Sequence, residues 1–117
     1  MDIISSSEDR LPPPAVATVV RDGVSYAQAE NGRSLGLQQV GGVLVASDST
    51  SGRPLWTLAV YGNAIDSRHE ADAQWLFFES MVFEPDGRLR IVNEARQAFL
   101  VNVLTRQVQA LRLKLVN

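Results

Sequence analysis

The sequence predicts an all-β protein, an antiparallel meander of about eight or nine strands with at most one short helix. Short runs rich in Val, Leu and aromatic residues recur along the chain, and each is bounded by Gly, Asp, Asn or Ser. Several runs alternate apolar and polar residues with a period of two, whereas helical periodicity is almost absent. Such a meander forms a small sandwich, a barrel or a propeller-blade-like sheet.

The chain divides into a tail and one domain. Of its 117 residues, 45% are hydrophobic and 21% are charged, and a domain of this size buries enough surface to fold without a disulfide or a metal. Residues 1–14 combine serines, a charged stretch and consecutive prolines with little apolar surface. We therefore expect a flexible N-terminal tail over residues 1–14 and a single antiparallel β domain over residues 15–117.

Turn sequences predict three hairpins. Asp22 and Gly23 lie between two Val-rich runs, and both tolerate the positive φ that a type I′ turn requires. In residues 85–87, proline suits the first corner of a type I turn, and glycine suits the left-handed position that follows. A third hairpin is expected where residues 49–52 separate two strand-like runs, 43–45 and 55–61.

Alternation predicts which strand faces are buried. In residues 88–91 and 111–115, apolar residues alternate with Arg or Lys, so these strands are expected to be half-exposed. Residues 75–78 and 99–101 are apolar at every position, which is expected of central strands covered on both faces. The one helical signal is the capping-box spacing of Ser67 and Glu70, which predicts a single turn before the aromatic strand.

One turn motif resembles the repeat of PQQ-type β-propeller blades. Its pattern, A-x-D-x-x-T-G-x-x-x-W, is matched, with serine at the threonine position, by Ala46, Asp48, Ser51, Gly52 and Trp56. A degenerate second copy occurs near the C-terminus, where the aspartate, glycine and tryptophan positions hold Asn102, Arg106 and Ala110. The chain as a whole resembles small bacterial β proteins that carry this motif.

The resemblance implies a fold but no activity. In propeller blades the Asp and the Thr-Gly pair shape the turn between two strands, and the tryptophan docks against the neighbouring blade. We therefore expect Trp56 to be largely buried. The quinone-binding and metal-binding residues of PQQ enzymes are not matched, so no cofactor is expected. A propeller of four blades needs about 160 residues, so this chain is too short to close one alone.

Composition excludes several function classes. The chain has no Cys and one His, which removes disulfide scaffolds, thiolate metal sites and cysteine nucleophiles. Its eleven Lys and Arg residues are scattered among thirteen acids, so nucleic acid is not an expected partner. No apolar run approaches the ~20 residues of a membrane span, and no signal-peptide pattern is visible. We expect a cytoplasmic protein without a membrane partner.

The expected binding surface surrounds the aromatic run. Strand alternation would place Trp75 and Phe77 on one face, and Leu76 and Phe78 on the other. One of these faces must be covered by a second layer, another copy or a partner. We predict a partner-binding site formed by Arg68, His69, Glu70, Trp75 and Phe78, because aromatic and Arg residues anchor interfaces. In the alternative, a two-layer fold hides both faces internally.

These observations favour a non-enzymatic protein–protein interaction module, such as an accessory or toxin-neutralising protein of a bacterium. Its partner would be another protein or a second copy, and no catalytic residue is expected, since no G-x-S-x-G elbow or phosphate-binding loop occurs. One alternative is a small-ligand binder or enzyme with a site in residues 63–74, where Asp66, His69, Glu70 and Asp72 could also hold a metal. The other is a self-assembling propeller-like structural protein.

Overall fold

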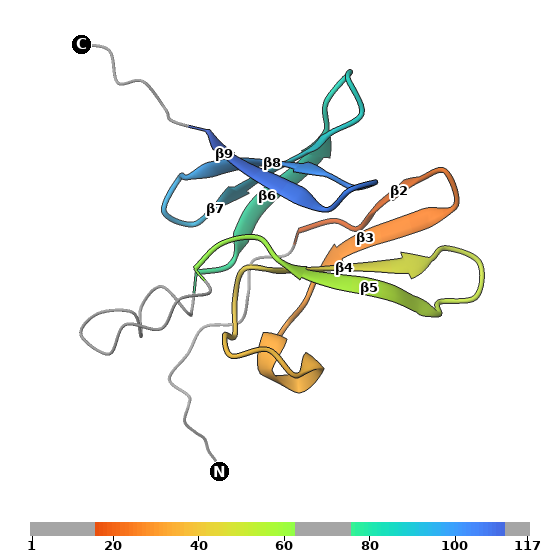
Figure 1. The fold of residues 1–117 in the computed structure, drawn as a ribbon, viewed down its shortest axis with the longest axis horizontal. Helices are drawn as coiled ribbons and strands as arrows, with labels where there is room; N and C mark the ends of the chain where they lie inside the picture. The colour runs from red at the N-terminus through yellow and green to blue at the C-terminus, as the bar shows by residue number, and fades with distance from the viewer. Residues whose placement is uncertain (1–15, 63–75, 112–117) are drawn as a thin grey trace.

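The computed structural model describes residues 16–62 and 76–111, which form two four-stranded antiparallel sheets (Figure 1). The first sheet consists of β2 (Val19–Arg21), β3 (Val24–Gln28), β4 (Val43–Asp48) and β5 (Pro54–Ala59). The second sheet consists of β6 (Phe78–Phe83), β7 (Leu89–Asn93), β8 (Ala98–Asn102) and β9 (Gln107–Leu111). Each sheet is a meander, with strands side by side in chain order.

The predicted all-β class is confirmed, with eight strands in the described ranges. The helical content of these ranges is one 3-10 turn, η1 (Gly32–Leu35). The described residues contain no helix long and apolar enough to cross a membrane. The expected tail over residues 1–14, the helical turn at Ser67 and the strand positions after Leu111 lie outside the described residues.

The three predicted hairpins are present. Asp22 and Gly23 both have positive φ, 53° and 79°, and Arg21 pairs directly with Val24 across this two-residue turn. At the second hairpin the backbone N–H of Gly87 donates to the carbonyl of Glu84 at 2.9 Å, and Gly87 has φ 94°. The third hairpin joins β4 to β5.

The β4–β5 and β8–β9 turns are built alike. The Oδ1 atom of Asp48 accepts hydrogen bonds from the backbone N–H groups of Thr50 and Ser51, at 2.8 and 2.9 Å. Asn102 Oδ1 accepts from the residues two and three positions further on, at 2.9 and 3.1 Å. Gly52 and Arg106, four positions after the acceptor residue, are both left-handed, with φ 79° and 66°. The two copies of the turn motif therefore adopt one conformation.

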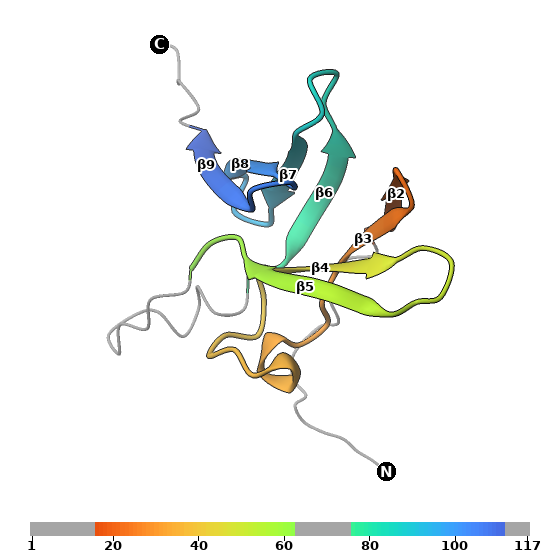
Figure 2. The ribbon, with the colours of Figure 1, turned by 45° about the vertical axis from the view of Figure 1, so that its right-hand side comes forward.

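The two sheets share one hydrophobic core, which lies where they face each other (Figure 2). Strands β3 and β4 contribute the buried residues of the first sheet, and β6, β7 and β8 contribute those of the second. The core consists of Tyr26, Leu44, Ala46, Val60, Phe78, Met81, Leu89, Ile91, Phe99 and Val101. Leu89 and Ile91 are buried while Arg90 is half-buried, which confirms the predicted alternation.

The prediction of two central apolar strands is half right. β8 lies between β7 and β9 and its residues Phe99 to Val101 are buried, although the first sheet covers only the face of Phe99 and Val101, and Leu100 is shielded by polar side chains of its own sheet. β6, by contrast, begins at Phe78 and is an edge strand. Phe77 and Phe78 are nevertheless buried, and the Phe78 ring lies in the shared core against Tyr61. Their backbone N–H groups donate to side chains distant in sequence, Phe77 to Glu94 and Phe78 to Gln28 of the first sheet.

The backbone of the loop before β4 packs closely against the residues that precede β6. A Cβ atom added at Gly41 would lie 2.3 Å from the carbonyl oxygen of Leu76, so only glycine fits there. The same carbonyl accepts a hydrogen bond from the Tyr61 hydroxyl at 2.7 Å, and the Tyr61 ring stacks on Phe99. Burial raises the pKa of Tyr61 above its usual value. Buried Gln39 donates to the carbonyls of Gly41 and Tyr61.

Candidate interaction surface

The two sheets form the core with different faces. In β4 the core residues Leu44 and Ala46 lie four and two positions before Asp48. Because side chains alternate along a strand, both lie on the same face of β4 as Asp48. In β8 the core residues Phe99 and Val101 are three and one positions before Asn102, on the opposite face. We call face A the side of each sheet that includes Ala46 or Leu100, and face B the other side.

Matching rows of cross-strand neighbours show the difference between the sheets. In the first sheet, face A carries the row Tyr26, Ala46 and Trp56. In the second sheet, the matching row on face A is Arg90, Leu100 and Gln109. The first row lies in the core, whereas the second row lies on the outside. The chain therefore packs face A of its first sheet against face B of its second sheet.

Trp56 is only partly buried, although it was expected to be largely buried. Its ring lies 6.0 Å from the Tyr26 ring, and the guanidinium of Arg106 lies over it at 5.5 Å. Arg106 belongs to the β8–β9 turn of the second sheet. Trp56 thus contacts the turn of the other sheet.

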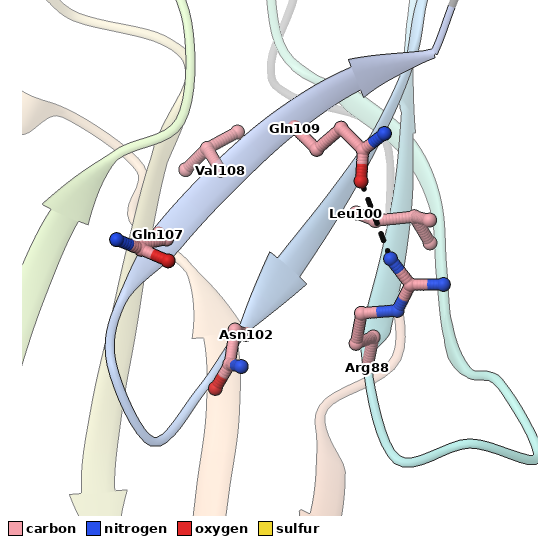
Figure 3. Close-up of a pocket in the computed structure, with 6 residues that line it drawn as sticks. All are labelled: Arg88, Leu100, Asn102, Gln107, Val108 and Gln109. Carbon is pink, nitrogen blue, oxygen red and sulfur yellow. Dashed lines mark hydrogen bonds between the residues drawn. The ribbon is translucent and has the colours of Figure 1, made fainter.

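Among the residues that the structure describes, none forms a layer over face A of the second sheet, and this face is slightly hollowed. The hollow has a volume of about 410 Å³ and is lined by Arg88, Leu100, Asn102, Gln107, Val108 and Gln109. Figure 3 shows the Arg88 side chain reaching the Gln109 amide beside Leu100, and these two groups form a hydrogen bond of 3.3 Å. Leu100 is 9% exposed, so the long polar side chains around it shield an apolar floor.

The charges on this face are paired within the sheet. Arg88 donates from Nε and Nη2 to Asp86 Oδ2, at 3.0 and 2.8 Å, and these bonds hold the pKa of Asp86 below its usual range. The same pairing raises the pKa of Arg88. Arg90 lies 4.0 Å from Glu84. Each of these two arginines therefore has an acidic side chain beside it within the sheet.

Among the described residues, face B of the first sheet is the second open surface, except at Val43, which is fully buried next to Gly32 of η1. Its side chains are small, and several carry hydroxyl groups: Ser25, Ala27, Val45, Ser47 and Thr57. Val20 at its edge is 60% exposed, and Leu55, the extra residue of the β4–β5 bulge, is 48% exposed. Leu35 of η1 and Val45 line a shallow hollow of about 370 Å³ beside it.

Exposed large hydrophobic residues gather on these two surfaces. Among the described residues, five such side chains are exposed. Val20, Leu35 and Leu55 lie on or beside face B of the first sheet, and Val82, 52% exposed, lies on face A of the second. The fifth, Leu104, projects from the β8–β9 turn and is 87% exposed.

A third hollow, of about 360 Å³, opens between the sheets at the end where their turns meet. Its walls include Tyr26, two arginines and two aspartates. Arg88 is paired with Asp86, while Arg21 stands over the Phe83 ring at 4.9 Å. This hollow is part of the seam that joins the two sheets.

Of the residues predicted to bind a partner, Phe78 alone is among the described residues. Arg68, His69, Glu70 and Trp75 lie outside the described residues, as do the other acids of the 63–74 segment. Phe78 is fully buried, with its ring tilted against Tyr61, as the two-layer alternative requires. Within residues 16–62 and 76–111, no three His, Asp or Glu side chains lie close enough to hold a metal ion.

Sequence reasoning missed Val82, Leu100 and Gln109. The signal that could have found them is the turn motif itself, because the two copies fix which strand positions correspond. The residues two positions before Asp48 and Asn102 lie on face A of their own sheets. The cross-strand neighbours are aromatic in the first sheet and polar in the second.

Comparison of the chain with family models, curated proteins and solved structures found no match. The function has to be inferred from the residues of the two open faces.

Proposed function

We propose that this protein is a non-enzymatic protein–protein interaction module that binds through the open faces of its sheets. The observation that carries the proposal is the position of the exposed large hydrophobic residues, four of which lie on or beside these two faces. Covering apolar surface is worth about 25 cal/mol per Å² removed from water. A partner therefore gains binding free energy by covering Val20 and Leu55 on the first sheet or Val82 on the second.

The polar groups of the second sheet suit an interface. Leu100 gives an apolar centre, and Arg88 and Gln109 surround it with donors and acceptors already held in place. An apolar centre within a polar rim is the common anatomy of protein interfaces. Because Arg88 is anchored on Asp86, less side-chain entropy is lost when a partner binds beside it.

Photo-cross-linking tests the proposal. A photoreactive amino acid replaces Val82 on face A of the second sheet, and in a matched variant it replaces Leu104 on the turn. After irradiation in cells, we expect a specific adduct, identified by mass spectrometry, from position 82 and little from position 104. The same experiment at Val20 probes the first sheet. Absence of any adduct at both Val82 and Val20 would overturn the proposed function.

A further inference from the structure

Building on the proposed function, we infer that the partner is a second copy of this chain, bound head to tail. In this arrangement, face A of the second sheet in one copy packs on face B of the first sheet in the next copy.

The contact inside the chain supports this arrangement. The two sheets have the same strand order and the same turn, yet they meet through unlike faces, A of the first and B of the second. The two faces left on the outside are face B of the first sheet and face A of the second, which are again one A and one B. A second copy can therefore repeat, between chains, the contact that each chain already makes between its own sheets. If the sheets met through like faces, the outer faces would also be alike, and a two-fold dimer would be the natural extension.

Side-chain sizes on the two outer faces are complementary. Face A of the second sheet carries long side chains, Arg88, Arg90 and Gln109, over the Leu100 floor. Face B of the first sheet carries Ser, Ala, Val and Thr at the facing positions, so it leaves room for them. Inside the chain the pairing is large against large, as with Tyr26 and Phe83, whose rings are 5.4 Å apart. The contact between copies would thus be more polar than the internal one, and the arginine stems would supply much of its apolar area.

The hollow on face A has a specific place in this arrangement. Inside the chain, Arg106 of the β8–β9 turn lies over Trp56 on face A of the first sheet. By cross-strand register the position that matches Trp56 in the second sheet is Gln109, which borders the hollow, because the β4–β5 bulge shifts the pairing by one residue from Ala110 of the sequence motif. The residue that matches Arg106 is Gly52, in the exposed β4–β5 turn. The hollow is therefore the seat for the β4–β5 turn of the next copy.

Each copy keeps one free face A and one free face B after such a contact forms, so further copies can add to both ends. The addition of copies stops when the last copy binds the first and closes a ring. We infer a closed ring in which every chain supplies two sheets, since closure leaves neither an A face nor a B face uncovered. Its mass is a fixed whole multiple of the 12.8 kDa chain.

Light scattering coupled to size exclusion measures this mass directly. The wild-type chain should have one mass of two or more chains, unchanged over a wide range of concentration. Val82→Glu and Val20→Glu should each reduce it to that of one chain. Val82→Glu should stay folded because Arg90 is its cross-strand partner, and circular dichroism with thermal unfolding checks this for both variants. Leu104→Glu, a change at an equally apolar exposed residue on neither face, should keep the wild-type mass.

Mixing the two variants separates head-to-tail contact from every like-face contact. The Val20→Glu chain keeps an intact face A, and the Val82→Glu chain keeps an intact face B. Their mixture should give a complex of one copy of each, and no larger species. A Val20→Glu chain with wild-type mass would overturn the inference, because a dimer through face A alone would not involve Val20. Failure of the mixture to associate would overturn it as well.

Outcomes for the inference and for the proposed function are distinct. A wild-type chain that stays monomeric at all concentrations overturns the second copy as partner, while a cross-link from position 82 to a different protein would still support an interaction module. Steady growth of mass with concentration would indicate an open filament and overturn ring closure. A monomer that cross-links to nothing overturns both.

Discussion

The first and second sheets share a strand order and a turn, but they differ in what covers face A. In the first sheet, Tyr26 and Trp56 flank Ala46, and the second sheet covers them. In the second sheet, Arg90 and Gln109 flank Leu100, and no described residue packs over them as a second layer. The same backbone thus supports a core or a surface, and the residues at two positions of one row decide which. Long polar side chains keep an apolar floor shielded until a partner binds.

The largest expected effect is the difference in free energy of unfolding between substitutions on the two faces of the second sheet. Ile91→Ala removes a fully buried side chain from face B and should lower the free energy of unfolding by about 2–5 kcal/mol. Val82→Ala, on face A of the same sheet, should change it by less than about 0.5 kcal/mol when both variants are made in the single-chain Val20→Glu background, where no second copy covers this face. Urea titration of both variants measures the two values. Equal losses would show that face A is covered as fully as face B.

Much of the fold could be predicted from local patterns. The Asp22–Gly23 turn, the glycine of the second hairpin and the alternation around Leu89 each depend on neighbours in sequence, and each is present. The second copy of the turn motif was also found, since Asn102 can make the same hydrogen bonds as Asp48. Local patterns could not predict that β6 is an edge strand, because Phe78 is buried by core residues of both sheets and by Tyr61, which are distant in sequence.

The candidate surface was harder to predict for the same reason. An apolar residue such as Phe78 reads as equally suitable for a core or an interface, and only the packing of the two sheets assigns it to the core. Val82, which lies on the open face, has no feature in its own sequence neighbourhood that separates it from buried Met81 beside it. Which face of a sheet is covered is a property of the pair of sheets, not of a strand.

The second comparison is between the matching turns, and the expected effect is smaller. Gly52→Ala places a side chain at a left-handed residue with no atom within 4 Å, so backbone strain alone should cost about 1 kcal/mol. Arg106→Gly relieves the same strain but loses the contact with Trp56, so its net effect should be below about 0.5 kcal/mol. Thermal unfolding of the two single variants measures both. A large loss in Arg106→Gly would mean that the Trp56 contact outweighs the strain.

The smallest expected effect is on the loss of stability at acidic pH. The backbone N–H groups of Ser51 and Thr50 hold the pKa of Asp48 below its usual value. Since the folded-state pKa is lowered, the contribution of Asp48 is fully present above the unfolded value of about 3.9 and is lost as the pH falls through the folded value. Asp48→Asn keeps the turn, as Asn102 does, but removes this titration. The melting temperature of the variant, measured from neutral to acidic pH, should therefore fall less steeply than that of the wild type.

Asp86 titrates in both proteins and serves as an internal reference, because its pKa is also lowered, mainly by hydrogen bonds from the Arg88 side chain. Part of the acid dependence should therefore remain in Asp48→Asn. Identical pH profiles for the variant and the wild type would show that the ionisation of Asp48 does not contribute to stability.

Each strand in both sheets is hydrogen-bonded to the strand next to it along the chain. Pairings of this kind form quickly, since a hairpin closes in about 1–10 μs. The contacts between sheets span much longer stretches, and the hydrogen bond from Phe78 to Gln28 joins residues 50 positions apart. A chain emerging from the ribosome can therefore complete β2 to β5 before β6 has been synthesised. Until the second sheet docks, the aromatic row of the first sheet is exposed to the cell, and that interval is when aggregation or chaperone binding is most favourable.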